Sequence, residues 1–174
     1  MPPRSAMPSR RSHARSPDVT DEFRRGVRLG IDVGKARVGV ARSDPDGLLA
    51  TPVETVPRDL GGDADIRAIA VIAEELGAVE LVVGLPIALS GKDTASTQDA
   101  REFASRLRSI TGVPARLVDE RLTTVTAHSA LRSAGKRQKQ TRSIVDQVAA
   151  VILLQYALDA ERGSGRPPGS PVDP

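Results

Sequence analysis

The order of strand-like and helix-like patterns limits the fold of this chain more than any other feature of its sequence. Three short runs rich in β-branched residues come first, at 27–33, 38–42 and 52–56. Residues 44–47, Asp-Pro-Asp-Gly, are a turn signal between the second and third runs. Because strands joined by short turns pair antiparallel, this part of the chain predicts a three-stranded antiparallel meander.

Helical and strand patterns alternate in the rest of the chain. Apolar residues at helical spacing predict helices over 66–76, 97–110, 124–134 and 143–161. Short, mostly apolar runs predict strands over 79–84 and 114–118. Strands that are linked by helices run parallel, with right-handed crossovers. The sequence therefore predicts an α/β fold in which helices flank a mixed five-stranded sheet, three antiparallel strands and then parallel ones.

The two ends of the chain differ in composition from this body. Residues 1–26 are rich in Arg, Ser and Pro, and residues 162–174 are rich in Gly, Pro and Ser. Segments of this kind bury too little apolar surface to fold. We therefore expect one domain over residues 27–161, between two disordered tails.

The composition excludes several kinds of catalytic site. The chain has no Cys, which rules out a disulfide framework, a thiol nucleophile and a Cys-ligated zinc. It has only two His residues, His13 and His128, so a His-rich metal site is excluded as well. Acid–base or metal chemistry then falls mainly on Asp and Glu, whose oxygens suit hard cations such as Mg²⁺ or Mn²⁺.

The net charge of +3 comes from the N-terminal tail. Residues 1–27 hold six Arg and three acidic residues, which is also +3, so the rest of the chain is balanced. Binding of nucleic acid by the body would need a local basic patch. No apolar run approaches the roughly 20 residues of a membrane span, and no secretory signal is visible. We therefore expect a soluble, cytoplasmic protein with no membrane partner.

Three acidic residues stand beside predicted core elements. Asp32 lies near the end of the first strand, where an uncompensated carboxylate would be costly. Glu120 directly follows the fifth strand, and Asp146 lies in the first turn of the last helix, on the same face as Ala150. Each also has an ordinary structural interpretation: an acid held by turn amides, an ion pair with Arg121, and an acid favoured by the helix dipole.

Taken together, the three acids predict a divalent-metal site. Strand ends of an open α/β sheet meet at the edge where ligands bind, and the last helix can pack against that edge. A single acid would not hold Mg²⁺, so the hypothesis requires that the three carboxylates converge. Two metal ions about 3.5–4 Å apart could activate a water and stabilise the leaving oxygen of a phosphodiester.

A run of basic residues leads into the last helix. Five of them lie within eleven residues without one acid: Arg132, Lys136, Arg137, Lys139 and Arg142. A solvated charge run is the ordinary interpretation. Because the run leads directly to Asp146, it also favours phosphate binding beside the acids.

Four motifs in order make the chain similar to one family. They are Gly30-x-Asp32-x-Gly34-x-x-Arg37-x-Gly39-Val40-Ala41, then Val83-Gly84-Leu85-Pro86 with Gly91, then Asp119-Glu120-Arg121-Leu122-Thr123-Thr124, and last Asp146-x-x-Ala149-Ala150-Val151. On these motifs, residues 29–158 resemble the YqgF family, also called RuvX, of Holliday-junction-resolvase-like proteins in the RNase H-like superfamily.

The resemblance implies an RNase H-like fold and an endonuclease that hydrolyses phosphodiester bonds. It implies that Asp32, Glu120 and Asp146 are catalytic and hold Mg²⁺ or Mn²⁺, while we expect Arg37 and Arg121, with the basic run, to bind nucleic acid. The family is associated with maturation of the 5′ end of pre-16S ribosomal RNA in ribosome biogenesis, and with resolution of four-way DNA junctions. The substrate is then pre-rRNA or branched DNA, and a symmetrical cut of a junction would call for a homodimer.

Two other functions fit parts of the sequence. The balanced charge of the body and the shortage of base-stacking aromatic residues fit a non-catalytic nucleic-acid or ribosome-associated protein on the same fold. Actin-like ATPases and sugar kinases also open with an Asp-x-Gly hairpin that contacts phosphate. They need a duplicated domain, however, and after Asp146 this chain has room for only one helix and a tail.

Overall fold

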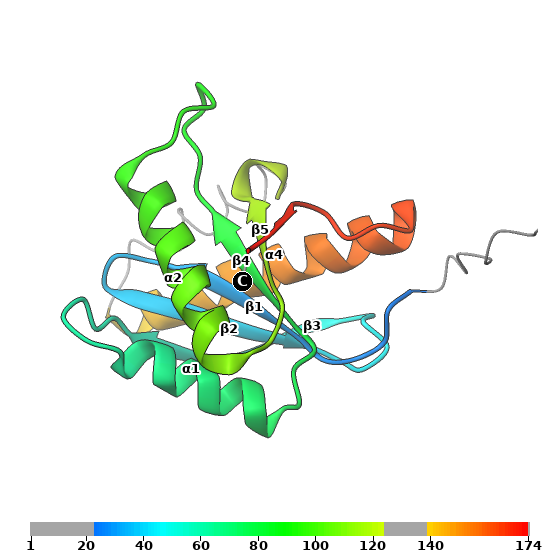
Figure 1. The fold of residues 1–174 in the computed structure, drawn as a ribbon, viewed down its shortest axis with the longest axis horizontal. Coiled ribbons are helices and arrows are strands. Elements are labelled where there is room, and N and C mark those ends of the chain that lie inside the picture. Colours follow the sequence, from blue (N-terminus) through cyan, green and yellow to red (C-terminus); the bar gives the residue numbers. More distant parts are fainter. Residues whose placement is uncertain (1–22, 124–138, 174) are drawn as a thin grey trace, which may run out of the picture.

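A six-stranded sheet with helices on both faces forms the body of the protein (Figure 1). The computed structural model describes residues 23–123 and 139–173, with side chains of the second range described from 145 onward. The strand order is β3-β2-β1-β4-β5-β6. The strands are β1 (Arg28–Val33), β2 (Arg37–Ser43), β3 (Ala50–Pro57), β4 (Glu80–Leu85), β5 (Ala115–Asp119) and β6 (Ser170–Pro171).

Three long helices and one short 3-10 helix are described. They are α1 (Ala64–Glu75), α2 (Ala95–Thr111), the 3-10 helix η1 (Glu120–Leu122) and α4 (Lys139–Ser164). In Figure 1, α1 and α2 lie on one face of the sheet and α4 crosses the opposite face. The helix predicted over 124–134 lies outside the described residues.

The pairing of the strands brings several strand ends to one edge. β1 pairs antiparallel with β2, where Asp32 stands opposite Gly39, and β2 pairs antiparallel with β3. β1 and β4 are parallel, as are β4 and β5. The carboxyl ends of β1, β3, β4 and β5 therefore share one edge of the sheet, where β2 begins. This mixed arrangement confirms the predicted fold class.

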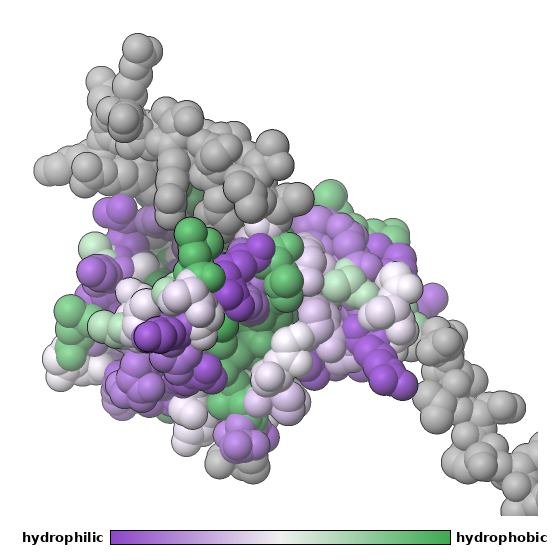
Figure 2. All heavy atoms as spheres, turned by 90° about the horizontal axis from the view of Figure 1, so that it is seen from above, coloured by the Kyte–Doolittle hydropathy of each residue, from purple (hydrophilic) through white to green (hydrophobic). Residues whose placement is uncertain are grey.

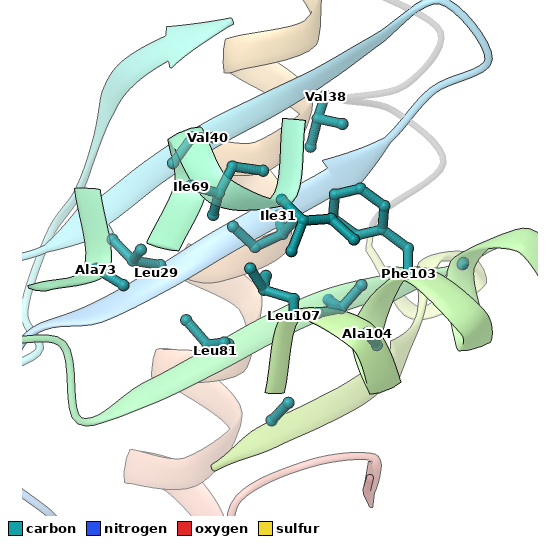
Figure 3. Close-up of a cluster of buried hydrophobic side chains, with 14 of the residues drawn as sticks. Leu29, Ile31, Val38, Val40, Ile69, Ala73, Leu81, Phe103, Ala104 and Leu107 are labelled. Carbon is teal, nitrogen blue, oxygen red and sulfur yellow. The ribbon is translucent and has the colours of Figure 1, made fainter. Parts of the chain in front are cut away.

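Alternate residues of the central strand face the two helical layers. Leu29 and Ile31 of β1 are fully buried in the core beneath α1 and α2, and Figure 3 shows Phe103 pointing from α2 toward the sheet. The other set of β1 residues faces α4, since a Cβ on Gly30 would lie 2.7 Å from the Cβ of Leu154. Asp32 follows Gly30 by two residues and so belongs to the α4 face.

Local signals in the sequence fix the ends of α2. The hydroxyl of Thr94 accepts a hydrogen bond from the amide of Thr97 (3.2 Å), and the hydroxyl of Thr97 accepts one from the amide of Thr94 (2.8 Å). This capping box starts the helix. Gly112 ends it in a left-handed conformation, with φ of 68°, that favours glycine.

The C-terminal segment is ordered, contrary to the prediction of a disordered tail over 162–174. α4 continues to Ser164, and β6 pairs antiparallel with β5, which gives the sheet a sixth strand. Val172 is 7% exposed and packs with the α1–α2 core. Composition does not reveal the contacts with distant residues that hold this segment, such as those of Arg116 with the carbonyls of Pro168 and Gly169 and of β6 with the edge of β5.

The last residues of the predicted N-terminal tail are also ordered. Arg24 pairs with Glu80 of β4 (3.0 Å) and with Glu161 of α4 (2.8 Å). The ring of Phe23 lies 4.6 Å from the guanidinium of Arg28, which is 1% exposed. Residues 23–26, which the sequence assigned to the tail, therefore contact the body through side chains whose partners lie far along the chain.

One face of the described surface is mixed in polarity. Figure 2 shows polar residues over much of the face seen from above, with apolar residues gathered in patches between them. Within the described part of the chain, none of the helices is long and apolar enough to cross a membrane.

Removal of the C-terminal segment tests its role in stability. We expect a variant that ends at Ser164 to lose about 2–4 kcal/mol of unfolding free energy, because Val172 leaves the core and Arg116 loses its carbonyl partners. Urea denaturation followed by circular dichroism measures this loss. A variant that ends at Val172 is the control and should unfold like the full chain. Equal midpoints for all three proteins would contradict the prediction.

Candidate active site

Asp32 stands where three acidic residues influence one another. Its removal from water is the largest effect on its carboxyl group and disfavours the charged form. The negative charges of Glu120 and Asp146 act in the same direction, as does a hydrogen bond with Glu120 in which protonated Asp32 is the donor. Together they raise the pKa of Asp32 to about 7. The three acids named from the sequence therefore interact across β1, η1 and α4.

Glu120 lies over the neighbouring strand. It follows β5 as the first residue of η1, and its Oε1 atom would lie only 2.6 Å from a Cβ placed on Gly84 of β4. Because β4 separates β5 from β1 in the sheet, this placement directs Glu120 toward Asp32. A larger residue at Gly84 would push the Glu120 carboxylate away.

Asp146 is held by Arg37. The Nε atom of Arg37, at the start of β2, donates to Oδ2 of Asp146 over 2.7 Å. Both side chains are partly exposed. This pair joins the first turn of the sheet to α4 and partly offsets the negative charge of the site. Arg37, which the sequence predicted to bind nucleic acid, is thus an ion-pair partner of Asp146 in this structure.

Glycines let α4 lie close to the sheet beside the acids. A Cβ on Gly39 of β2 would overlap the main-chain carbonyl of Asp146, and one on Gly30 of β1 would lie 2.7 Å from the carbonyl oxygen of Ala150. Gly39 also stands opposite Asp32 in the sheet. Gly39 was part of a motif with no predicted role of its own, although glycine inside a strand often marks the close approach of another backbone.

The donor set fits a hard divalent cation in its chemistry. Carboxylate oxygens are the ligands that Mg²⁺ and Mn²⁺ prefer, and a cation would relieve the repulsion that raises the pKa of Asp32. As they stand, no three His, Asp or Glu side chains within the described ranges are close enough to hold a metal ion together. Binding of a cation by all three acids would therefore need movements of their side chains.

The predicted basic residues are divided between described and undescribed parts of the chain. Arg121 is exposed and binds Asp119 over 2.6 Å, which lowers the pKa of Asp119. Arg121 therefore neutralises Asp119, whereas Glu120 interacts with Asp32. Three residues of the basic run lie outside the described residues: Arg132, Lys136 and Arg137. For Lys139 and Arg142 only the backbone, at the start of α4, is described.

The comparisons with known proteins agree on one family. A model of the RuvX family, described as Holliday junction resolvase, matches residues 26–160. A protein of Leifsonia xyli subsp. xyli is 63% identical over 152 residues, which cover 87% of this chain and 97% of that protein. A protein of Clavibacter michiganensis is 60% identical over 150 residues, which cover 86% and 93%. Both carry the name "Putative pre-16S rRNA nuclease".

Solved structures support the same fold class. The structure of "T. thermophilus RuvC in complex with Holliday junction substrate" aligns with a TM-score of 0.53 and covers 84% of this chain and 99% of that chain. Its sequence identity of 17% limits the comparison to the fold, which is RNase H-like. The resemblance drawn from the four motifs is confirmed.

Substitution of Gly39 tests the close packing of α4. We expect Gly39→Ala to lower the free energy of unfolding by about 1–3 kcal/mol, because the added methyl group overlaps the carbonyl of Asp146 and forces α4 away from β2. Chemical denaturation measures the change. Gly61→Ala is the matched control, since a Cβ at Gly61 meets nothing within 4 Å. If both variants unfold like the wild type, α4 does not depend on Gly39.

Substitution of Asp32 tests the repulsion among the acids. A raised pKa in the folded state means that the fold loses stability as pH rises from about 4 to about 7, and that the loss persists above 7. Asn cannot ionise, so without divalent cations Asp32→Asn should be more stable than the wild type by roughly 2–4 kcal/mol at pH 8 and by less at pH 5.

Thermal unfolding at the two pH values measures this difference. Added Mg²⁺ should raise the midpoint of the wild type more than that of Asp32→Asn, because a bound cation stabilises only the fold that holds it. A midpoint of Asp32→Asn at or below that of the wild type at pH 8 would contradict the prediction.

Proposed function

The chain belongs to the RuvX family, and from this membership we propose that it is an endonuclease that hydrolyses phosphodiester bonds in structured nucleic acid. The observation that carries the proposal is the electrostatic convergence of Asp32, Glu120 and Asp146 at the carboxyl edge of the sheet. Acids whose mutual repulsion perturbs their titration are typical of functional sites. In an ordinary structural cluster, nearby basic residues would offset such charges.

Asp32, Glu120 and Asp146 are the residues that would hold Mg²⁺ or Mn²⁺. When bound there, a divalent cation supplies a Lewis acid for the phosphodiester and makes a water molecule a better nucleophile at neutral pH. Asp32 contributes the most rigid of the three carboxylates, since it belongs to the central strand. Glu120 and Asp146 come from a 3-10 helix and from α4, whose side chains can adjust to the substrate.

Arg37 has two roles in this proposal. In the described arrangement its guanidinium offsets the charge of Asp146. Its side chain is about one-third exposed, so the same guanidinium can donate to a phosphate oxygen when a nucleic-acid backbone lies beside the acids. Arg37, Arg121 and the basic run of residues 132–142 would then position the backbone, while the acids act on one phosphate.

Pre-16S ribosomal RNA is the favoured substrate. The relatives that share 60–63% identity over nearly their whole length are named for that substrate, whereas the RuvC likeness is distant in sequence. Four-way DNA junctions are the second candidate, in view of the family description, and a symmetrical cut would then require a homodimer with two sites. Processing of ribosomal RNA precursors would place the protein in the cytoplasm.

A cleavage assay with both substrates tests the function. In Mn²⁺ or Mg²⁺, the wild type should cut a pre-16S rRNA fragment at its 5′ side faster than a four-way DNA junction. Asp32→Asn should lower cleavage by about 100-fold or more, because the site loses a charged ligand, while the dissociation constant for substrate changes little.

Asp46→Asn is the control for a lost negative charge. Asp46 lies in the turn between β2 and β3, at the end of these strands that is opposite to the candidate site. Its substitution should therefore leave the cleavage rate unchanged. Wild-type protein that binds both substrates but cuts neither would favour the non-catalytic alternative. Undiminished cleavage by Asp32→Asn would overturn the site assignment.

A further inference from the structure

Arg58 contacts the turn between β1 and β2 and the two helices on that face of the sheet, α1 and α2. It directly follows β3, and its side chain is 6% exposed. Its Nη1 atom donates to the carbonyl oxygen of Gly34 over 3.0 Å. Its Nε donates to Asp65 of α1 (3.1 Å), and Nη1 and Nη2 donate to Asp99 of α2 (2.9 and 2.8 Å). One guanidinium therefore links the turn to both helices on that face.

The position of Arg58 is itself fixed by its neighbours. Its guanidinium lies 5.1 Å from the centre of the Phe103 ring, which belongs to the core beneath α2 (Figure 3). Asp65 also accepts hydrogen bonds from the amides of Asp59 (3.1 Å) and Ile66 (2.8 Å), so this carboxylate has little freedom to move. Burial of a charged guanidinium is costly, and two carboxylates and an aromatic face offset the cost here.

The turn that Arg58 holds connects two residues of the candidate site. Gly34 follows Asp32 by two residues, and its amide donates to the carbonyl oxygen of Arg37 over 2.9 Å. The amide of Arg58 donates to the carbonyl oxygen of Ala36 over 3.0 Å. The main chain and the side chain of Arg58 thus bind the same turn at two points, between an acid and the arginine that pairs with Asp146.

We propose that Arg58 is a positioning residue for the candidate active site. Its hydrogen bonds go to the turn, Asp65 and Asp99, so Arg58 acts on the backbone from which Asp32 and Arg37 extend. This inference rests on the proposed function and deepens it, since misplacement of reacting groups by about 1 Å can cost 100-fold in rate. Arg58 should therefore affect the cleavage step far more than the binding of substrate.

Arg58→Gln and Arg58→Lys test the proposal by single-turnover cleavage. Gln lacks the charge and the fork of donors, so cleavage should fall by about 10- to 100-fold, while the dissociation constant for substrate changes by less than about 3-fold. Lys keeps the charge and one hydrogen bond, so its rate should lie between those of Gln and the wild type.

Arg116→Gln is the matched control. Arg116 is also a mostly buried arginine that binds a carboxylate, Glu80 (3.4 Å), and main-chain carbonyls, those of Pro168 and Gly169 (both 3.2 Å). It lies near the start of β5, away from the candidate site. The Arg116→Gln variant should lose stability as Arg58→Gln does, but it should keep the wild-type cleavage rate. A cleavage loss in Arg116→Gln equal to that in Arg58→Gln, or no loss in Arg58→Gln, would overturn the proposal.

Amide hydrogen exchange gives a readout that does not depend on activity. The Gly34 amide should exchange about 10-fold faster or more in Arg58→Gln than in the wild type or in Arg116→Gln, because its hydrogen bond closes the turn. Unchanged exchange at Gly34 would overturn the proposal even if cleavage fell. If the wild type cuts neither substrate, the proposed function fails, and the exchange rates alone then decide whether Arg58 holds the turn.

Discussion

The close approach of α4 to the sheet is the constraint on which the candidate site depends. Glycine in β1, β2 and β4 leaves room for the helix and for the Glu120 side chain, so carboxylates from three separate elements come near enough to influence one another's charge. Packing of apolar residues on both faces of the sheet supplies the free energy that holds like charges together. The raised pKa of Asp32 is the electrostatic result of that packing.

Charged side chains are paired differently at the two ends of the sheet. At the end away from the site, Arg24, Arg28 and Arg116 surround Glu80 and Glu161, so acids and bases are paired. At the site, Arg37 pairs with Asp146. The guanidinium of Arg58 donates its hydrogen bonds to the turn, to Asp65 and to Asp99. The first cluster pairs its charges within the fold, whereas in the second the charges of Glu120 and Asp146 raise the pKa of Asp32. Perturbed titration of this kind is typical of functional sites.

The sequence predicted the parts of the structure that depend on local patterns. Apolar spacing identified the five main strands and the described helices, and the three acids were found because each sits beside a core element. Contacts between residues that are far apart in the sequence could not be predicted from local patterns. The Arg37–Asp146 pair joins residues 109 positions apart, and the partners of the Arg58 side chain lie in the β1–β2 turn, in α1 and in α2. Gly39 carries no side chain from which a contact could be inferred, and β6 depends on an edge that exists only after β5 has folded.

The short strand β6 limits how two copies of this protein could associate. An exposed strand edge offers unpaired amides and carbonyls to another chain, but β6 already covers part of that edge on β5. A proline within β6 also removes one donor from the outer side. Continuous sheet formation between copies is therefore disfavoured at this side of the molecule. A dimer that cut both strands of a junction would then form through another surface, and the choice of that surface would set the distance between its two sites.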